Sequence, residues 1–174
     1  ALGCYLMDGT GCFLPESKRN LPTPLVSALK LLGFSKKYYA NAVSRDDKGN
    51  VAVLVGAFML LKRSLYKEVN GFDQDYFMYG EDIDLSYKLE KAGFKNYYLG
   101  TALTLHYKGE STTKNKIYLQ RFYGAMAIFY EKHFTTNFLI DGVIKCMVWF
   151  QTHLFSHSSS QTPKAKNIQA GYVM

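Results

Sequence analysis

Three carboxylates stand close together at Glu81, Asp82 and Asp84, directly behind an aromatic run and Gly80. A carboxylate at the start of a helix, following a flexible glycine, can point into a cleft and act as a general base. Adjacent carboxylates also raise the proton affinity of one of the pair. The alternative is that the acids only offset the helix macrodipole, by roughly 0.3–1 kcal/mol each. For Asp84 we favour this alternative, with an i,i+4 ion pair to Lys88 on the outer face of the helix.

A histidine and a hydroxyl-rich basic turn form a second group with chemical potential. His106 is followed by Lys108, a glycine and Ser111. Imidazole binds Mn²⁺-type cations, and a lysine with turn amides can hold phosphate oxygens. The alternative is a packed or exposed histidine with no ligand. The segment suits an anion-and-metal site, but neither HExxH nor GxxxxGK[ST] is present to strengthen that interpretation.

The elements that would position these groups follow from hydrophobic periodicity. Residues 51–63 are almost continuously apolar and rich in valine, which predicts a buried strand, and Gly56 within it indicates a close backbone approach. Residues 15–24 are basic and proline-rich, which predicts irregular structure. The remaining pattern predicts helices over 25–32, from Glu81 to Gly93 and over 116–133, and separate strands over 95–99 and 102–107.

Composition bounds the class of protein. The chain has 174 residues, enough for one domain with a core, and a net charge of +7, which favours an anionic partner such as a nucleotide diphosphate or anionic lipid. Nucleic acid is disfavoured, because the basic residues are scattered between acids and no groove-binding motif occurs. The three cysteines lack CxxC spacing and are interpreted as reduced thiols in a cytosolic protein.

The C-terminal region carries its own alternatives. Residues 138–155 are strongly apolar but include charged side chains, and a membrane span needs about 20 mostly apolar residues, so we do not expect a crossing. The segment either packs on the core as a helix or lies in the bilayer surface, and if exposed it can pair two copies of the chain into a homodimer. We divide the region into a helix over 135–156 and a disordered tail over 157–174.

The order of the motifs supplies a resemblance. A glycine-bearing apolar segment from Val55 is followed by "GFD", an aromatic run, "ED" with another acid two residues on, "AG", and then His106. This order resembles the second half of a family 2 glycosyltransferase of the GT-A fold, in the bacterial rhamnosyltransferase-like branch. The resemblance runs from about Leu2 to His133. It implies an α/β fold in which residues 1–134 form the C-terminal, acceptor-side half of a Rossmann-like GT-A domain: a mixed sheet with flanking helices, plus C-terminal helices.

The resemblance also implies roles for matching positions. Asp82 corresponds to the catalytic base of the family, with Glu81 as the alternative candidate. His106 matches a late histidine that completes the coordination of a divalent cation, Mg or Mn, on the donor diphosphate. Gly56 and Ala57 fall on the segment that borders the donor sugar.

Three further residues fall within the resemblance. Phe72 and Asp73 lie in the "GFD" that shapes the acceptor side. Arg19 falls in a variable loop over the cleft, where the resemblance gives it no definite role.

The activity implied by the resemblance is sugar transfer with inversion, from a nucleotide-sugar donor to a glycan or lipid-linked acceptor. Such a protein would serve bacterial polysaccharide or cell-envelope assembly, in the cytoplasm or peripherally at the inner face of the plasma membrane. The DxD motif expected in the nucleotide-binding half is missing, so we expect that half to precede Ala1 and the chain alone to be inactive. The alternative from another class is a non-catalytic carbohydrate- or lipid-binding module.

Overall fold

The computed structural model describes residues 1–31, 33–107, 116–134 and 142. Its main sheet has the order β1-β5-β3, with β1 parallel to β5 and β3 antiparallel to it. A second, two-stranded antiparallel sheet pairs β2 with β4. The strands are β1 (Leu2–Met7), β2 (Lys18–Arg19), β3 (Lys48–Val51), β4 (Val53–Leu54) and β5 (Asn96–Leu105). The expected α/β architecture with a mixed sheet and flanking helices is confirmed.

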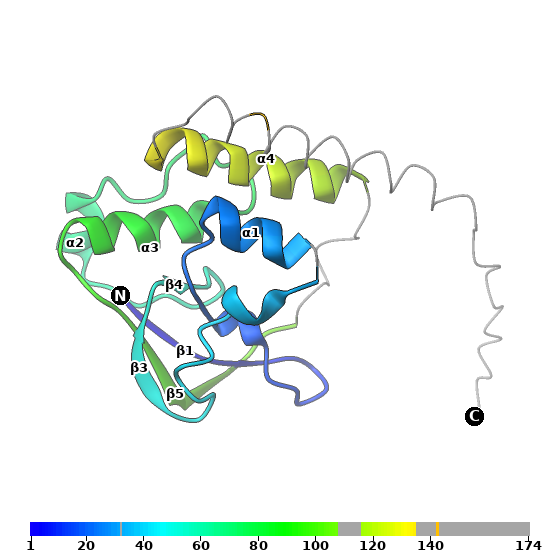
Figure 1. The fold of residues 1–174 in the computed structure, drawn as a ribbon. Coiled ribbons are helices and arrows are strands. Elements are labelled where there is room, and N and C mark those ends of the chain that lie inside the picture. The colour runs from blue at the N-terminus through cyan, green and yellow to red at the C-terminus, as the bar shows by residue number, and fades with distance from the viewer. Residues whose placement is uncertain (32, 108–115, 135–141, 143–174) are drawn as a thin grey trace, which may run out of the picture.

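The helices lie in layers on one side of the main sheet (Figure 1), with α3 between the strands and α4. The α-helices are α1 (Pro24–Leu31), α2 (Arg63–Glu68), α3 (Glu81–Lys91) and α4 (Lys116–His133), and two 3₁₀ turns are η1 (Pro15–Ser17) and η2 (Ser35–Lys37). The helices predicted from Glu81 to Gly93 and over 116–133 are confirmed as α3 and α4. Residues 135–141 and 143–174, with the predicted C-terminal helix, tail and dimer contact, lie outside the described residues.

Helix α3 buries side chains on two faces, which explains its central position. Leu85 and Leu89 are fully buried in a cluster with Val69, beneath the helix. Ile83 faces the other way, into a cluster with Phe129 of α4. The helix ends where Gly93 adopts a left-handed φ of +85°, a conformation that glycine adopts at little cost. Packing on both faces therefore fixes the orientation of the first turn of α3.

The strand predicted over 51–63 is wrong. Strand β3 ends at Val51, β4 covers only Val53–Leu54, and the chain then turns, with the N–H of Phe58 donating to Val55 O. Leu60, which is 59% exposed, pairs with Leu2 at a single bridge. Apolar content is shared by buried strands and by loops that cover a sheet edge, so composition alone did not separate them.

Two smaller predictions are also wrong. Residues 95–99 and 102–107 are not separate strands: β5 is continuous, and the register with β1 shifts where Cys4 pairs with Leu99 and Tyr5 pairs with Leu103. The glycine between them marks an irregularity within one strand. The proline-rich segment 15–24 is not wholly irregular, because it contains η1 and β2. Its prolines flank the strand and leave the N–H groups of β2 free to pair.

Candidate functional site

The first turn of α3 presents the acidic group. Gly80 precedes the helix with φ +84°, and the N–H of Asp84 donates to Gly80 O at 2.8 Å. A Cβ at Gly80 would lie 3.0 Å from Tyr76 and 3.1 Å from Ala125, so both the conformation and the space favour glycine. The acids of this turn lie where the positive end of the helix dipole stabilises negative charge.

Asp82 is held in place by two donors on one oxygen. Its Oδ2 accepts a hydrogen bond from Arg19 Nη2 at 2.7 Å and from the backbone N–H of Gly56 at 2.9 Å. The side chain is 12% exposed, and its other oxygen, Oδ1, accepts no hydrogen bond from a described residue. The carboxylate is therefore oriented through Oδ2, which leaves Oδ1 available to a substrate group.

Arg19 is the counter-charge of this site. It comes from β2, 63 residues away along the chain, and is 8% exposed. Its Nη2 also donates to Leu54 O at 2.9 Å, which ties it to β4. Burial by itself lowers the pKa of Arg19, but the Asp82 charge outweighs burial and raises that pKa above its usual value. The ion pair is therefore fully formed at neutral pH.

A second cation and a phenol extend the site behind Arg19. The Nζ of Lys30 lies 3.2 Å from the ring centroid of Tyr38, which is 4% exposed. Burial would raise the pKa of Tyr38, but the charges of Arg19 and Lys30 together lower it. Burial lowers the pKa of Lys30. Two cations, Arg19 and Lys30, thus flank Tyr38 on the Arg19 side of the site.

Glu81 differs from its neighbour. Burial, together with the nearby Asp82 charge, raises the pKa of Glu81. Its Oε2 is buried and has no hydrogen-bond partner among the described residues. Glu81 therefore holds a proton more readily than an ordinary glutamate, and its side chain is less firmly held than that of Asp82.

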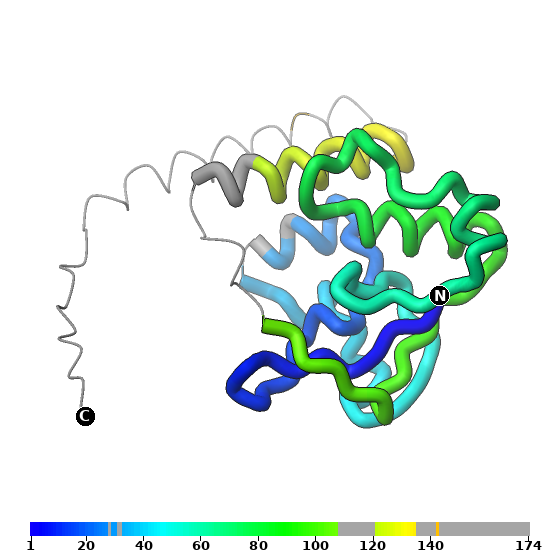
Figure 2. Tube along the Cα trace, turned by 180° about the vertical axis from the view of Figure 1, so that it is seen from behind, coloured from blue at the N-terminus to red at the C-terminus, as the bar shows by residue number. Residues whose placement is uncertain are grey.

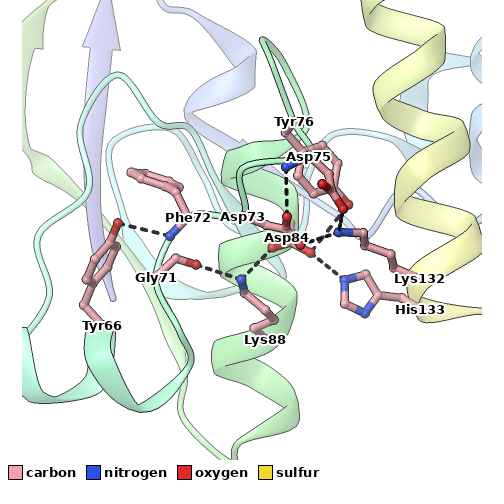
Figure 3. Close-up of polar contacts among 10 residues, drawn as sticks. All are labelled: Tyr66, Gly71, Phe72, Asp73, Asp75, Tyr76, Asp84, Lys88, Lys132 and His133. Atoms are coloured by element: carbon pink, nitrogen blue, oxygen red, sulfur yellow. Dashed lines mark hydrogen bonds and ion pairs between the residues drawn. The ribbon is translucent and has the colours of Figure 1, made fainter.

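Asp84 points to the opposite side of α3 and binds α4 (Figure 3). It is fully buried, and its Oδ2 lies 2.8 Å from Lys88 Nζ while its Oδ1 lies 2.5 Å from His133 Nε2. Tyr76 approaches the same oxygen at a long 3.5 Å. The predicted Asp84–Lys88 pair is confirmed. Its placement on an outer face is wrong, because α4 covers this side of α3.

A second ionic contact lies beside the first (Figure 3). Lys132 of α4 lies 2.5 Å from both Asp73 Oδ2 and Asp75 Oδ2. The hydrogen bond from Lys132 is the main cause that lowers the pKa of Asp73. The "GFD" segment is therefore bound to α4, while Phe72 is 46% exposed and its N–H donates to Tyr66 OH at 3.0 Å.

Of the other predicted site residues, Gly56 contacts the acids of α3, whereas Ala57 and His106 show no such contact among the described residues. Gly56 contacts Asp82, and a Cβ there would lie 3.3 Å from the Asp82 Cβ, so the predicted close approach is confirmed. Ala57 is exposed. His106 follows β5, and its N–H donates to Met7 O, but no hydrogen bond or ion pair with a described residue joins it to the acids of α3. Lys108 and Ser111 lie outside the described residues.

The next question is whether the described residues could hold a divalent cation. Within the described ranges, no three or more His, Cys, Asp or Glu side chains gather in a way that could hold a metal ion. His106 alone supplies one ligand, and a divalent cation needs several. The described residues therefore do not fit a complete metal centre, and the expected metal stays a prediction.

Sequence reasoning missed the role of Arg19 and the contribution of His133. A buried arginine near a carboxylate leaves no local signal when 63 residues separate them. His133 is the last residue of α4, a helix that periodicity predicted, but its partner depends on how α4 crosses α3.

Cys4 and Cys12 are free thiols as predicted, whereas Cys146 lies outside the described residues. No helix in the part of the chain described here has both the length and the apolar character to cross a membrane.

Comparison with known proteins gives consistent results. The family described as glycosyltransferase like family 2 matches residues 7–124. An N-acetylglucosaminyl-diphospho-decaprenol L-rhamnosyltransferase of Mycobacterium tuberculosis is 34% identical over 122 residues, which cover 66% of this chain and 39% of the relative. The rhamnosyltransferase WbbL of Escherichia coli is 50% identical over 52 residues, covering 30% of this chain and 20% of the relative.

The chain thus spans well under half the length of the relatives that it matches. No solved structure matches significantly. The family match covers more than half of the chain and includes Gly56, the acids of α3 and His106. The mixed α/β fold agrees with a fragment of a GT-A-like domain. The chain belongs to the family 2-like glycosyltransferases and resembles their rhamnosyltransferase branch.

Proposed function

We propose that this chain forms the acceptor-side part of an inverting glycosyltransferase, which moves a sugar from a nucleotide-sugar donor to a lipid-linked or glycan acceptor. The family membership supports sugar transfer. The acceptor class is suggested by a relative whose name specifies a diphospho-decaprenol-linked sugar as acceptor and L-rhamnosyl transfer as reaction. We also propose a role in cell-envelope glycan assembly, at the cytoplasmic face of the membrane.

The reaction is a single displacement. The acceptor hydroxyl oxygen forms a bond to the anomeric carbon, and the bond from that carbon to the nucleotide diphosphate breaks, with its electron pair leaving on the diphosphate. Asp82 takes the hydroxyl proton on Oδ1, which has no partner among the described residues. Attack on the face opposite the leaving group inverts the anomeric centre.

The clamp on Asp82 is the observation that carries this proposal. Arg19 and the Gly56 N–H both bind Oδ2, so the carboxylate is kept in one orientation before the acceptor arrives. Orientation of this kind lowers the entropy cost of proton transfer. Because Gly56 borders the acid directly, we propose that Gly56 and Ala57 also place the donor sugar next to the same carboxylate.

Glu81 is the alternative base. Its raised pKa favours acceptance of a proton, but its Oε2, which has no partner among the described residues, is buried and would have to move to meet a hydroxyl. We assign Asp82 the transfer step and Glu81 a supporting charge. His106, Lys108 and Ser111 remain proposed ligands of the donor diphosphate and its cation.

The test is Asp82→Asn in the longer enzyme that includes the expected nucleotide-binding half, supplied with nucleotide-activated L-rhamnose and a prenyl-diphosphate-linked N-acetylglucosamine. The expected loss of transfer is about 10²–10⁴-fold, with donor affinity unchanged. Glu81→Gln should cost less than Asp82→Asn, and Asp46→Asn, at an exposed ion pair, serves as the control. Equal loss of donor binding in Asp82→Asn would make the carboxylate structural. Transfer that does not depend on Asp82 would favour a non-catalytic carbohydrate- or lipid-binding module.

A further inference from the structure

A pocket outside the Asp82 site lies between residues 75–78 and α4. Its volume is about 170 Å³, and its walls include Phe77 and Met78 from the loop and Ala125 and Ile128 from the helix. Phe77 is 78% exposed and Met78 is 38% exposed. Figure 2 shows the loop that precedes α3 passing beside α4. Apolar side chains left open in this way mark interaction sites when they are contiguous.

Gly124 gives the pocket an unfilled wall. It lies within the 18-residue helix α4 and lines the pocket, yet a Cβ at this position would meet no atom within 4 Å. Glycine in a helix interior is less stable than alanine by roughly 0.5–1 kcal/mol. Alanine would therefore fit and would stabilise the helix. The missing side chain at Gly124 therefore leaves room for a ligand in the pocket.

Arg121 places a positive charge at the rim of the pocket. Its guanidinium carbon lies 4.7 Å from the ring centroid of Phe77. Arg121 is exposed and forms no ion pair with any described residue, whereas the acid of the pocket, Asp75, is bound to Lys132. Among the described residues, the pocket thus combines apolar walls with a cation that has no ionic partner. This combination complements a hydrocarbon chain that carries an anionic group.

We propose that this pocket binds the start of the prenyl chain of a prenyl-diphosphate acceptor, with Arg121 facing the diphosphate. The inference rests on the proposed function and deepens it, because it specifies a lipid-linked acceptor over a free glycan. An apolar cavity of about 150 Å³ holds one benzene molecule, so a pocket of about 170 Å³ accommodates about one isoprene unit.

The position of the pocket agrees with that occupant. Tyr76 and Ala125, which line the pocket, also pack against the position of Gly80, the residue that immediately precedes α3. Asp82 faces β2 and β4, on another side of the same helix. In a lipid-linked sugar, the sugar ring and diphosphate separate the reacting hydroxyl from the prenyl chain. The chain must therefore bind near the start of α3 but apart from the base.

The experiment measures binding of farnesyl diphosphate by calorimetry, with no donor present. Gly124→Leu fills the pocket and Arg121→Gln removes the rim charge, and each should weaken binding by at least about tenfold. Lys36→Gln, which removes an exposed charge elsewhere, should change binding less than about twofold. Gly124→Leu replaces a helix-interior glycine, so a thermal midpoint equal to or above the parent shows that the variant is folded.

Farnesol, inorganic diphosphate and anionic phosphatidylglycerol vesicles are the competing ligands. Inorganic diphosphate bound as tightly as farnesyl diphosphate would overturn the proposal, as would vesicle binding that Gly124→Leu leaves intact. Unchanged farnesyl diphosphate binding in both pocket variants would also overturn it. If transfer to a prenyl-linked sugar occurs but Gly124→Leu leaves the KM for that acceptor unchanged, the assignment of the pocket is wrong and the proposed function stands. If pocket-dependent binding occurs but the longer enzyme that includes the nucleotide-binding half shows no transfer, the subsite stands and the proposed reaction fails.

Discussion

Asp82 and Asp84 lie two residues apart in the first turn of α3, and their surroundings differ in every respect that bears on function. Asp82 faces the small sheet and is bound through one oxygen by Arg19 and the Gly56 N–H. Asp84 faces α4 and is bound through both oxygens by Lys88 and His133. Among the described residues, Asp82 has one oxygen without a partner, whereas both oxygens of Asp84 are already paired.

Helix geometry accounts for this division. With 3.6 residues per turn, two residues are separated by roughly 200° around the axis, so their side chains point to opposite faces. A buried carboxylate that is fully paired fixes the packing of two helices, whereas a carboxylate with one oxygen free can accept a proton. The same short motif thus serves two purposes because both faces of α3 are covered by different elements.

The largest expected effect on stability comes from breaking the Asp84 side. Asp84→Asn removes the only negative charge between Lys88 and His133 among the described residues, and breaking a buried pair costs about 3–5 kcal/mol. Urea unfolding should report a loss near the lower end, about 3 kcal/mol. Asp46→Asn, at an exposed pair, should change the free energy of unfolding by less than about 1 kcal/mol. A loss no larger than that of the control would remove Asp84 from its structural role.

A smaller stability effect and a clear activity effect are expected at Arg19. Arg19→Met leaves Asp82 with the Gly56 N–H alone and should cost about 1–3 kcal/mol of unfolding free energy, together with most of the transfer rate. Arg19→Lys keeps the charge and should recover part of both. Parallel denaturation and transfer assays check this. Full activity in Arg19→Met would show that the ion pair does not orient the base.

The exposed contact between Lys132 and the "GFD" segment should contribute less. Lys132→Ala is expected to cost about 0.2–1 kcal/mol at neutral pH, against no change for Lys67→Ala on α2. The lowered pKa of Asp73 means that this stabilisation is present above the usual carboxylate range, near pH 4, and is lost as the pH falls further. Unfolding curves at pH 7 and pH 3 should therefore converge for parent and variant. A difference that persists at pH 3 would contradict the assignment.

The smallest effect is expected at Glu81 and has the opposite sign. Its raised pKa means that the folded state prefers the protonated acid, so stability falls as the pH rises from about 4.5 through the folded pKa. Glu81→Gln should therefore stabilise the protein at pH 7, by less than about 1 kcal/mol because the group is half-exposed. Thermal unfolding at pH 7 and pH 4 measures this gain. A gain that is equal at both pH values would point to a cause other than ionisation.

Much of this arrangement could be predicted from the sequence, because it depends on local patterns. The bounds of α3 and α4 followed from periodicity and from glycines that end helices, and the acidic doublet stood out by residue type. Contacts between distant segments could not be predicted. Arg19 meets Asp82, and His133 meets Asp84, only because β2, α3 and α4 pack in one particular way. The apolar run at 51–63 wrongly predicted one strand, because the loop that follows Leu54 is also rich in apolar residues although it is partly exposed.

The transfer rate per folded molecule should be measured for Asp82→Asn and Asp84→Asn side by side, together with the thermal midpoint of each. Asp82→Asn removes the reacting carboxylate, so we expect it to lose transfer even in the molecules that remain folded. Asp84→Asn should lose several degrees of midpoint and keep transfer in the molecules that remain folded. Transfer that is retained per folded molecule in Asp82→Asn, or lost per folded molecule in Asp84→Asn, would contradict a division of labour across α3.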